Sequence, residues 1–268
     1  MSAILPVLEL MQGRMKVLAY HGVEADPSGP YAVGRQEFAA QMHFLADQGF
    51  EVIGLDALLA RLRTRQLNAR CLALTFDDGY KSVIDNALPV LERLRYTATI
   101  FLPTQLISGW PQTAAAGATS WPNFMDWQDV VQLRRMGLQF GGHTMNHRAL
   151  LKIPLQQARE EIVGSFCDLR AYIRQEFVPF AYPYGQYNST IADLVKRAGF
   201  SCACGYGDIL GNSARTDLFR LRRESIVQAT SLNEFSHKVN PNKDAFRKFC
   251  SVWRRRASRP KLPPPFTA

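Results

Sequence analysis

The sequence alternates short apolar runs with longer segments of helical periodicity, and this alternation most limits the folds open to the chain. Continuous apolar runs such as 71–76 (CLALTF) and 97–102 (TATIFL) are typical of strands buried on both faces. Strands separated by helices predict a parallel α/β sheet or barrel. The predicted strands are 16–20, 51–53, 71–76, 97–102, 138–142, 177–182, 200–204 and 221–227, and the predicted helices are 35–48, 56–65, 82–94, 126–136, 155–175 and 190–198.

The size and composition fit one large globular domain without a membrane span. The chain has 268 residues, of which 47% are apolar and 21% charged. No apolar run approaches the roughly 20 residues that cross a bilayer, and the N-terminus lacks the basic start of a secretory signal. The five cysteines include no C-x-x-C pair. We therefore expect no signal peptide, no transmembrane segment and a reducing, cytoplasmic location.

The net charge of +9 is concentrated near the C-terminus. Residues 247–261 hold seven basic residues and no acidic one, which leaves +2 for the rest of the chain. We expect an N-terminal extension over 1–15, one domain over 16–240 and a basic, proline-ending tail over 241–268. It gives no support for nucleic-acid binding by the domain. The tail is either a solvated end or a site of peripheral contact with an anionic membrane at the cytoplasmic face.

Two adjacent carboxylates, Asp77 and Asp78, directly follow the buried strand 71–76. Neighbouring carboxylates repel one another, and their placement at a strand end is costly unless a cation lies there. An ordinary Asp-Gly turn is the plain alternative. A phosphatase with an aspartyl nucleophile is a weaker one, because that chemistry spaces its two aspartates two residues apart.

Two histidines, His143 and His147, follow the predicted strand 138–142 with i, i+4 spacing. On one helical turn this spacing lets both rings reach a single ion. The absence of Glu at position 144 argues against a thermolysin-like site. Two histidines and one aspartate match the three-protein-ligand pattern of a catalytic zinc, with a fourth position open for water.

The polar motifs share one location in the predicted fold. His21, Asp77–Asp78, His143–His147 and Pro183–Gly185 all lie just beyond the C-terminal ends of predicted strands. Active sites of α/β barrels lie at that end, whereas chance motifs would fall at both ends. The sequence therefore predicts one site formed by all of these segments.

Three motifs resemble those of a known family. TFDDG (75–79), HTMNH (143–147) and FAYPYG (180–185), in this order, resemble the motifs of polysaccharide deacetylases, the NodB-like domains of carbohydrate esterase family four. The resemblance extends from about residue 16 to 239, and the early YHG (20–22) resembles the poly-N-acetylglucosamine deacetylase branch. It implies a distorted, incomplete (β/α)7 barrel. It also implies a hydrolase that removes N-acetyl groups from an amino-sugar-containing polysaccharide or oligosaccharide.

The resemblance also implies a metal and a base. Asp78, His143 and His147 would hold Zn²⁺ or another divalent transition metal. Asp77 would be the general base for a zinc-bound water that attacks the amide carbonyl.

The acid and the substrate contacts follow from the same resemblance. His21 would be the general acid that protonates the departing amine. The backbone N–H of Tyr184 would stabilise the oxyanion. Tyr184 and Pro183 would contact the substrate, and Trp127 is a further candidate, for which packing of its helix against the barrel is the alternative.

One feature departs from the family pattern. Many members carry an arginine in the third motif that orients the catalytic aspartate, and Phe180 and Ala181 occupy that stretch here. Arg223, on the last predicted strand, is a candidate for this charge, and an ordinary surface arginine is an equally open alternative.

Two other functions remain open at this point. A metal hydrolase of this kind could act on an O-ester or on a non-sugar amide. A non-catalytic carbohydrate-binding relative is the other alternative, but it has no need of an uncoordinated base such as Asp77.

Overall fold

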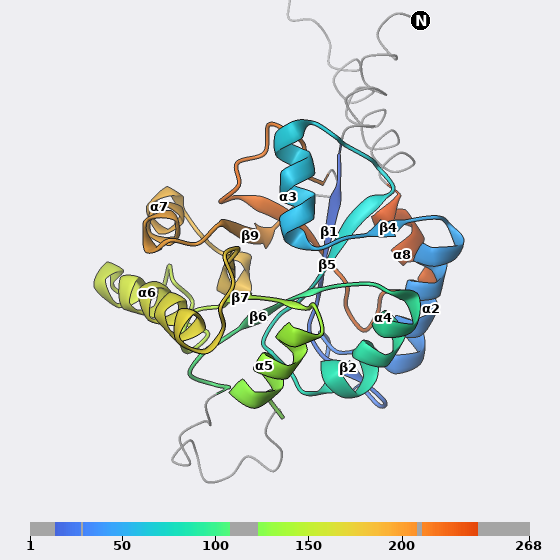
Figure 1. Cartoon of the computed structure of the whole chain (residues 1–268), viewed down its shortest axis with the longest axis horizontal. Coiled ribbons are helices and arrows are strands. Elements are labelled where there is room, and N and C mark those ends of the chain that lie inside the picture. Colours follow the sequence, from blue (N-terminus) through green and yellow to red (C-terminus); the bar gives the residue numbers. More distant parts are fainter. Residues whose placement is uncertain (1–13, 28, 108–122, 208–210, 241–268) are drawn as a thin grey trace, which may run out of the picture.

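A closed barrel of seven parallel strands forms the centre of the protein (Figure 1). The computed structural model describes residues 14–27, 29–107, 123–207 and 211–240. The barrel strands are β1 (Lys16–Tyr20), β5 (Cys71–Phe76), β6 (Thr99–Leu102), β7 (Gln139–Gly142), β8 (Pro179–Ala181), β9 (Cys202–Tyr206) and β10 (Leu221–Ser225). They follow the order β1-β10-β9-β8-β7-β6-β5, and β1 pairs with β5 to close the ring. The predicted (β/α)7 barrel is confirmed.

The barrel is distorted where its strands pair unevenly. β7 and β8 are joined by a single register pair, Gly142↔Phe180. β5 pairs with β1 over residues 72–76. On its other edge it pairs first with β4 (Glu51–Val52) and then with β6. Two short strands that the sequence pattern did not predict, β2 (Val23–Glu24) and β3 (Val33–Gly34), pair with each other outside the barrel.

Helices follow most of the strands, as the alternating pattern predicts. They are α2 (Arg35–Asp47), α3 (Leu55–Thr64), α4 (Leu88–Leu94), α5 (Trp127–Arg135), α6 (Leu155–Tyr172), α7 (Ser189–Ala198) and α8 (Leu232–Val239). The predicted helix over 82–94 is present as one continuous helical run, but it is not α-helical throughout. A π-helical turn, Val83–Ala87, comes first and leads directly into α4, and Pro89 lies at the start of α4, just after this turn. Helix α8 was not predicted.

Two apolar clusters stabilise the barrel. The larger one lies between the strands and the surrounding helices and includes Tyr20 and Phe76. The smaller one includes inward-facing residues at the first halves of the strands, such as Val17 and Cys202, together with four leucines of α3: Leu55, Leu58, Leu59 and Leu62. Helix α3 therefore covers the N-terminal mouth of the barrel, and only the C-terminal mouth is left for a site.

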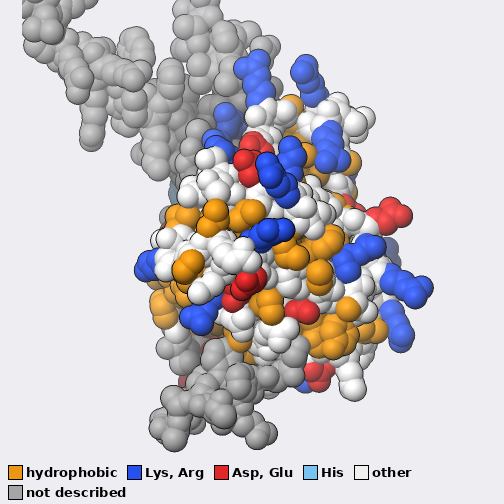
Figure 2. All heavy atoms as spheres, turned by 90° about the vertical axis from the view of Figure 1, so that its left-hand side faces the viewer, with side chains coloured by type: hydrophobic (Ala, Val, Ile, Leu, Met, Phe, Trp, Pro, Cys, Tyr) orange, Lys and Arg blue, Asp and Glu red, His pale blue; other side chains and the backbone are white. Residues whose placement is uncertain are grey.

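The described surface is mixed in character, and none of the helices in the described ranges has the length and apolarity needed to cross a membrane. On the face shown in Figure 2, Lys and Arg side chains are interspersed with apolar and acidic ones. The predicted N-terminal extension lies almost entirely, and the predicted basic tail wholly, outside the described residues.

Candidate active site

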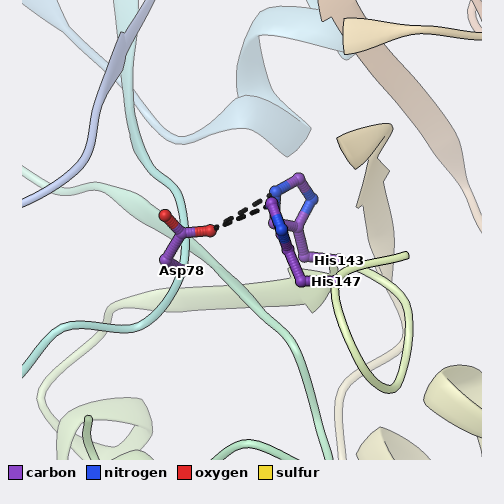
Figure 3. A group of neighbouring side chains, drawn as sticks. All are labelled: Asp78, His143 and His147. Atoms are coloured by element: carbon purple, nitrogen blue, oxygen red, sulfur yellow. Dashed lines mark ion pairs between the residues drawn. The ribbon is translucent and has the colours of Figure 1, made fainter. Parts of the chain in front are cut away.

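Three potential metal ligands meet at the C-terminal mouth of the barrel (Figure 3). Asp78 follows β5, His143 follows β7, and His147 comes four residues later. The segment between the histidines is a turn with left-handed residues and not the helical turn that the spacing predicted. Asp78 Oδ1 is 3.6 Å from His143 Nε2 and 3.4 Å from His147 Nε2. Two ligands about 2.1 Å from a tetrahedral ion lie about 3.4 Å apart, so these separations suit a single ion.

The protonation and hydrogen bonding of these residues also suit a cation. Asp78 Oδ1 is buried without a hydrogen-bond partner among the described residues, and burial raises the pKa of this carboxyl to about 6. His143 Nδ1 donates to the Ala181 carbonyl at 2.7 Å, which leaves the Nε2 lone pair facing Asp78. Burial lowers the pKa of His143 to about 3, so the ring is neutral near pH 7. Two neutral imidazoles and one carboxylate fit a divalent transition metal.

The backbone of the site is strained. Six described residues other than glycine have left-handed backbones, and two of these end helices α3 and α4. The other four lie in the predicted motifs: Asp78, Thr144, His147 and Tyr184, with φ of 71°, 64°, 55° and 59°. Such conformations cost of order 1–3 kcal/mol each and persist where the surroundings hold them. The strain is therefore concentrated in the segments that present the candidate ligands.

Helix α6 holds the histidine-bearing loop in this conformation. The Glu161 carboxylate accepts hydrogen bonds from the backbone N–H groups of Met145 and Asn146 at 2.9 and 2.8 Å. Asp168, two turns further along the helix, accepts from the Thr104 hydroxyl at 2.6 Å, and the Thr104 N–H donates to the carbonyl of Thr144, inside the loop. Carboxylates that hold the segment around candidate metal ligands also help to orient those ligands.

Asp77, the other member of the carboxylate pair, points to a different partner. It is 1% exposed, and Arg223 donates to its two oxygens at 2.6 and 2.8 Å. The guanidinium lies 5.2 Å from the ring centroids of both Phe101 and Tyr206. Burial by itself raises the pKa of Asp77, but Arg223 and nearby histidines more than offset it, so the pKa lies below its ordinary value. Arg223 is itself 1% exposed, so the surface-arginine alternative is wrong.

Tyr206 is a residue of the site that the sequence analysis missed. Its hydroxyl donates to Asp77 Oδ2 at 3.3 Å and lies 3.4 Å from His21 Nε2. Its ring packs against Gly185, where any side chain would collide with it. Like the other site residues it stands at the end of a strand. The predicted strand ended at Cys204, two residues too early to include it.

The predicted substrate-contact residues differ in their surroundings. Tyr184 is 57% exposed, its ring lies 4.8 Å from that of His147, and its N–H donates to no carbonyl of the described chain. Pro183, the preceding residue, is buried. Trp127 is only 9% exposed and stacks on Tyr172 at 4.1 Å, so little of its ring is free for a sugar. The packing alternative accounts for the position of Trp127.

Comparison with known proteins places the chain among deacetylases. Residues 64–203, just over half of the chain, match the family model described as Polysaccharide deacetylase. A putative polysaccharide deacetylase, YxkH, from Bacillus subtilis (strain 168) is 24% identical over 188 residues, which cover 70% of this chain and 62% of that protein. The poly-β-1,6-N-acetyl-D-glucosamine N-deacetylase of Escherichia coli (strain K12) is 23% identical over 260 residues, 83% of this chain and 38% of that protein. The chain thus spans less than two thirds of either relative.

Solved structures of similar fold include a Streptococcus pyogenes deacetylase, PplD, in complex with acetate. It has a TM-score of 0.73 and 22% identity, covering 85% of this chain and 99% of that chain. IcaB from Ammonifex degensii has a TM-score of 0.70 and 23% identity, covering 85% of this chain and 97% of that one. At these identities the likeness shows the fold.

Proposed function

Since the chain belongs to the polysaccharide deacetylase family, we propose that it is a metal-dependent hydrolase that removes N-acetyl groups from an amino-sugar-containing polysaccharide or oligosaccharide. The observation that carries the proposal is that the two neighbouring carboxylates have different partners. Asp78 faces two imidazoles, whereas Asp77 is turned away to a buried arginine. One carboxylate is thus available to bind a metal, and the other is kept ionised and uncoordinated, as a general base must be.

Asp78, His143 and His147 are the residues that would hold the metal, and zinc is the first candidate because it favours this donor set. When bound, such an ion supplies Lewis-acid chemistry, since it polarises a carbonyl and lowers the pKa of a coordinated water to about 7. The metal is required because an unactivated amide is a poor electrophile.

Asp77 accepts a proton from the water that attacks the acetyl carbonyl. Arg223 holds both carboxylate oxygens and lowers the pKa of the group, so Asp77 is ionised when the substrate arrives. The ion pair also fixes the direction of the carboxylate. General-base catalysis of this kind typically contributes about 10²–10⁴-fold to the rate.

His21 protonates the amide nitrogen as it departs, because an amine leaves poorly without a proton. The Tyr206 hydroxyl lies between the acid and the base, 3.4 Å from His21 Nε2 and 3.3 Å from Asp77 Oδ2. We assign Tyr206 as a positioning residue that holds these two groups on either side of the scissile bond. The Tyr184 N–H donates to the carbonyl oxygen as negative charge develops there.

The names of the E. coli and other relatives make a β-1,6-linked oligomer of N-acetylglucosamine the first substrate to test. Acetate release is measured from this oligomer, from a β-1,4-linked oligomer and from a simple O-acetyl ester, with and without added zinc. We expect zinc-dependent release from an oligomer, and loss of that release in Asp77→Asn. Release from the ester alone would favour an esterase, and acetate production unaffected by Asp77→Asn would contradict the assigned base.

The cytoplasmic location and the membrane contact of the basic segment 247–261 are separate proposals that rest on composition. Co-sedimentation with neutral and phosphatidylserine-containing vesicles tests the contact, using the full chain and a variant that ends at Asn242. Equal, negligible binding by the two proteins would leave the tail a solvated end.

A further inference from the structure

Two exposed tyrosines flank the candidate active site. Of the nine tyrosines in the chain, only Tyr31, Tyr172 and Tyr184 are more than half exposed, at 58%, 53% and 57%. Tyr172 stacks on Trp127, with ring centroids 4.1 Å apart. The other two rings each touch an imidazole of the site: Tyr31 lies 5.1 Å from His21, and Tyr184 lies 4.8 Å from His147.

These two rings stand on opposite sides of the barrel mouth. The Tyr31 ring packs against His21, which follows β1, and Tyr184 follows β8. Around the seven-stranded ring, β8 is three strands from β1 through β10 and β9, and four strands through β5, β6 and β7. No two strands of a ring of seven can be further apart. The carboxylates after β5 and the histidines after β7 come from the arc between them.

The backbones of both tyrosines are held in place although their rings are exposed. The residues on either side of Tyr31 are tied down: the Pro30 carbonyl accepts from Gln228 N–H at 3.0 Å, and Val33 N–H donates to the Gly22 carbonyl at 2.9 Å. Tyr184 has a left-handed backbone, with φ of 59°. A large ring on a fixed backbone loses little conformational freedom when a ligand packs on it, which favours binding.

We propose that Tyr31 is a stacking platform for a sugar ring next to the deacetylated unit, opposite Tyr184, which the family resemblance already gives as a substrate contact and which we expect to stack on the sugar ring of the other side. This inference rests on the proposed function and extends it, because it assigns the substrate as an internal residue of a chain rather than a free monosaccharide. The negatively polarised face of a tyrosine ring suits the C–H-bearing face of a pyranose. With one platform on each side, a trisaccharide places its central N-acetyl group over the metal ligands.

Binding to zinc-loaded protein, measured by calorimetry, tests the assignment independently of turnover. All variants carry Asp77→Asn, so that the ligand is not consumed. The probes are N-acetylglucosamine and its β-1,6-linked trisaccharide. We expect Tyr31→Ala and Tyr184→Ala each to weaken trisaccharide binding roughly three- to tenfold, the contribution of one stacked aromatic ring, and to change monosaccharide binding less than about twofold.

Two controls separate stacking from other roles. Tyr31→Phe keeps the ring and should bind the trisaccharide as the parent does. Tyr172→Ala removes an equally exposed ring that touches no site residue and should also have no effect. Unchanged trisaccharide binding in Tyr31→Ala would overturn the assignment, as would an equal loss for both probes, which would indicate an effect through His21. If the parent binds neither probe and the native enzyme releases no acetate from the trisaccharide, the proposed function itself fails.

Discussion

Replacement of Arg223 with methionine should destabilise the fold by roughly 3–5 kcal/mol, the usual cost of leaving one charge of a buried ion pair without its partner. The upper part of this range is expected, because Asp77 and Arg223 are each 1% exposed and solvent cannot replace the lost guanidinium. The substitution also removes the cation from between the rings of Phe101 and Tyr206. Since domains of this kind are typically stable by about 5–15 kcal/mol, the variant should still fold.

A double-mutant cycle separates the ion pair from general damage to the core. Asp77→Asn alone leaves a buried guanidinium without a counter-charge and should also be destabilising. The double variant Asp77→Asn/Arg223→Met buries neither charge and should lie within about 1 kcal/mol of wild type, because uncharged replacements of buried pairs are often neutral or stabilising. Urea unfolding followed by tryptophan fluorescence, with zinc and with a chelator, gives the coupling energy.

The pH dependence of stability is a second test of the ion pair, because the contribution of Asp77 should change with pH in opposite directions in wild type and in Arg223→Met. In wild type the pKa of Asp77 is lowered, so its contribution is complete above the ordinary carboxyl pKa of about 3.9 and is lost as pH falls through the lower folded value. Without Arg223, burial should raise this pKa. The folded variant would then keep a proton that the unfolded chain releases, so its stability should fall as pH rises from about 4.

Activity completes the test. Arg223→Met should lose most of its kcat while it keeps its metal, because the base is protonated or misdirected whereas the ligands are untouched. The kcat of Arg223→Lys should lie between those of wild type and Arg223→Met, since a lysine cannot bind both carboxylate oxygens in one plane. Additive single-variant effects, each below about 1 kcal/mol, would refute the view that this pair is an electrostatic unit.

The remaining predictions concern the other residues of the site. His143→Ala should lose its bound metal while Asp77→Asn retains it; elemental analysis of dialysed protein decides, and equal metal content in wild type and His143→Ala would refute the ligand set. His21→Ala should keep its metal and lose kcat by roughly 10²–10⁴-fold, with a smaller loss for substrates whose leaving group needs no proton; near-normal turnover on the amide would exclude His21 as the acid. Tyr206→Phe should lower kcat about tenfold and change KM less than twofold, since one hydrogen bond to a charged group is lost; steady-state kinetics would contradict the positioning role if KM alone changed.

Much of the fold and of the metal site could be predicted because both depend on local patterns. Strands buried on both faces need continuous apolar runs, and 71–76 is such a run in sequence and in structure. The polar residues that follow it lie at the same end of the barrel as those that follow 139–142, since parallel strands share a direction. The meeting of the Asp77–Asp78 pair with His143 and His147 was therefore predictable from these patterns, whereas the choice of Asp78 as the ligand came from the family resemblance.

The tertiary structure alone decided which side chains meet across the barrel. Arg223 contacts Asp77 although 146 positions separate them, and Tyr206 lies between Asp77 and His21 from a third strand. These contacts depend on strand order and register around a closed ring, which no local pattern contains. The covering of the N-terminal mouth by α3 has the same origin. The periodicity of apolar residues predicts that a residue is buried or that a strand ends. Which residue it contacts depends on the topology of the whole chain.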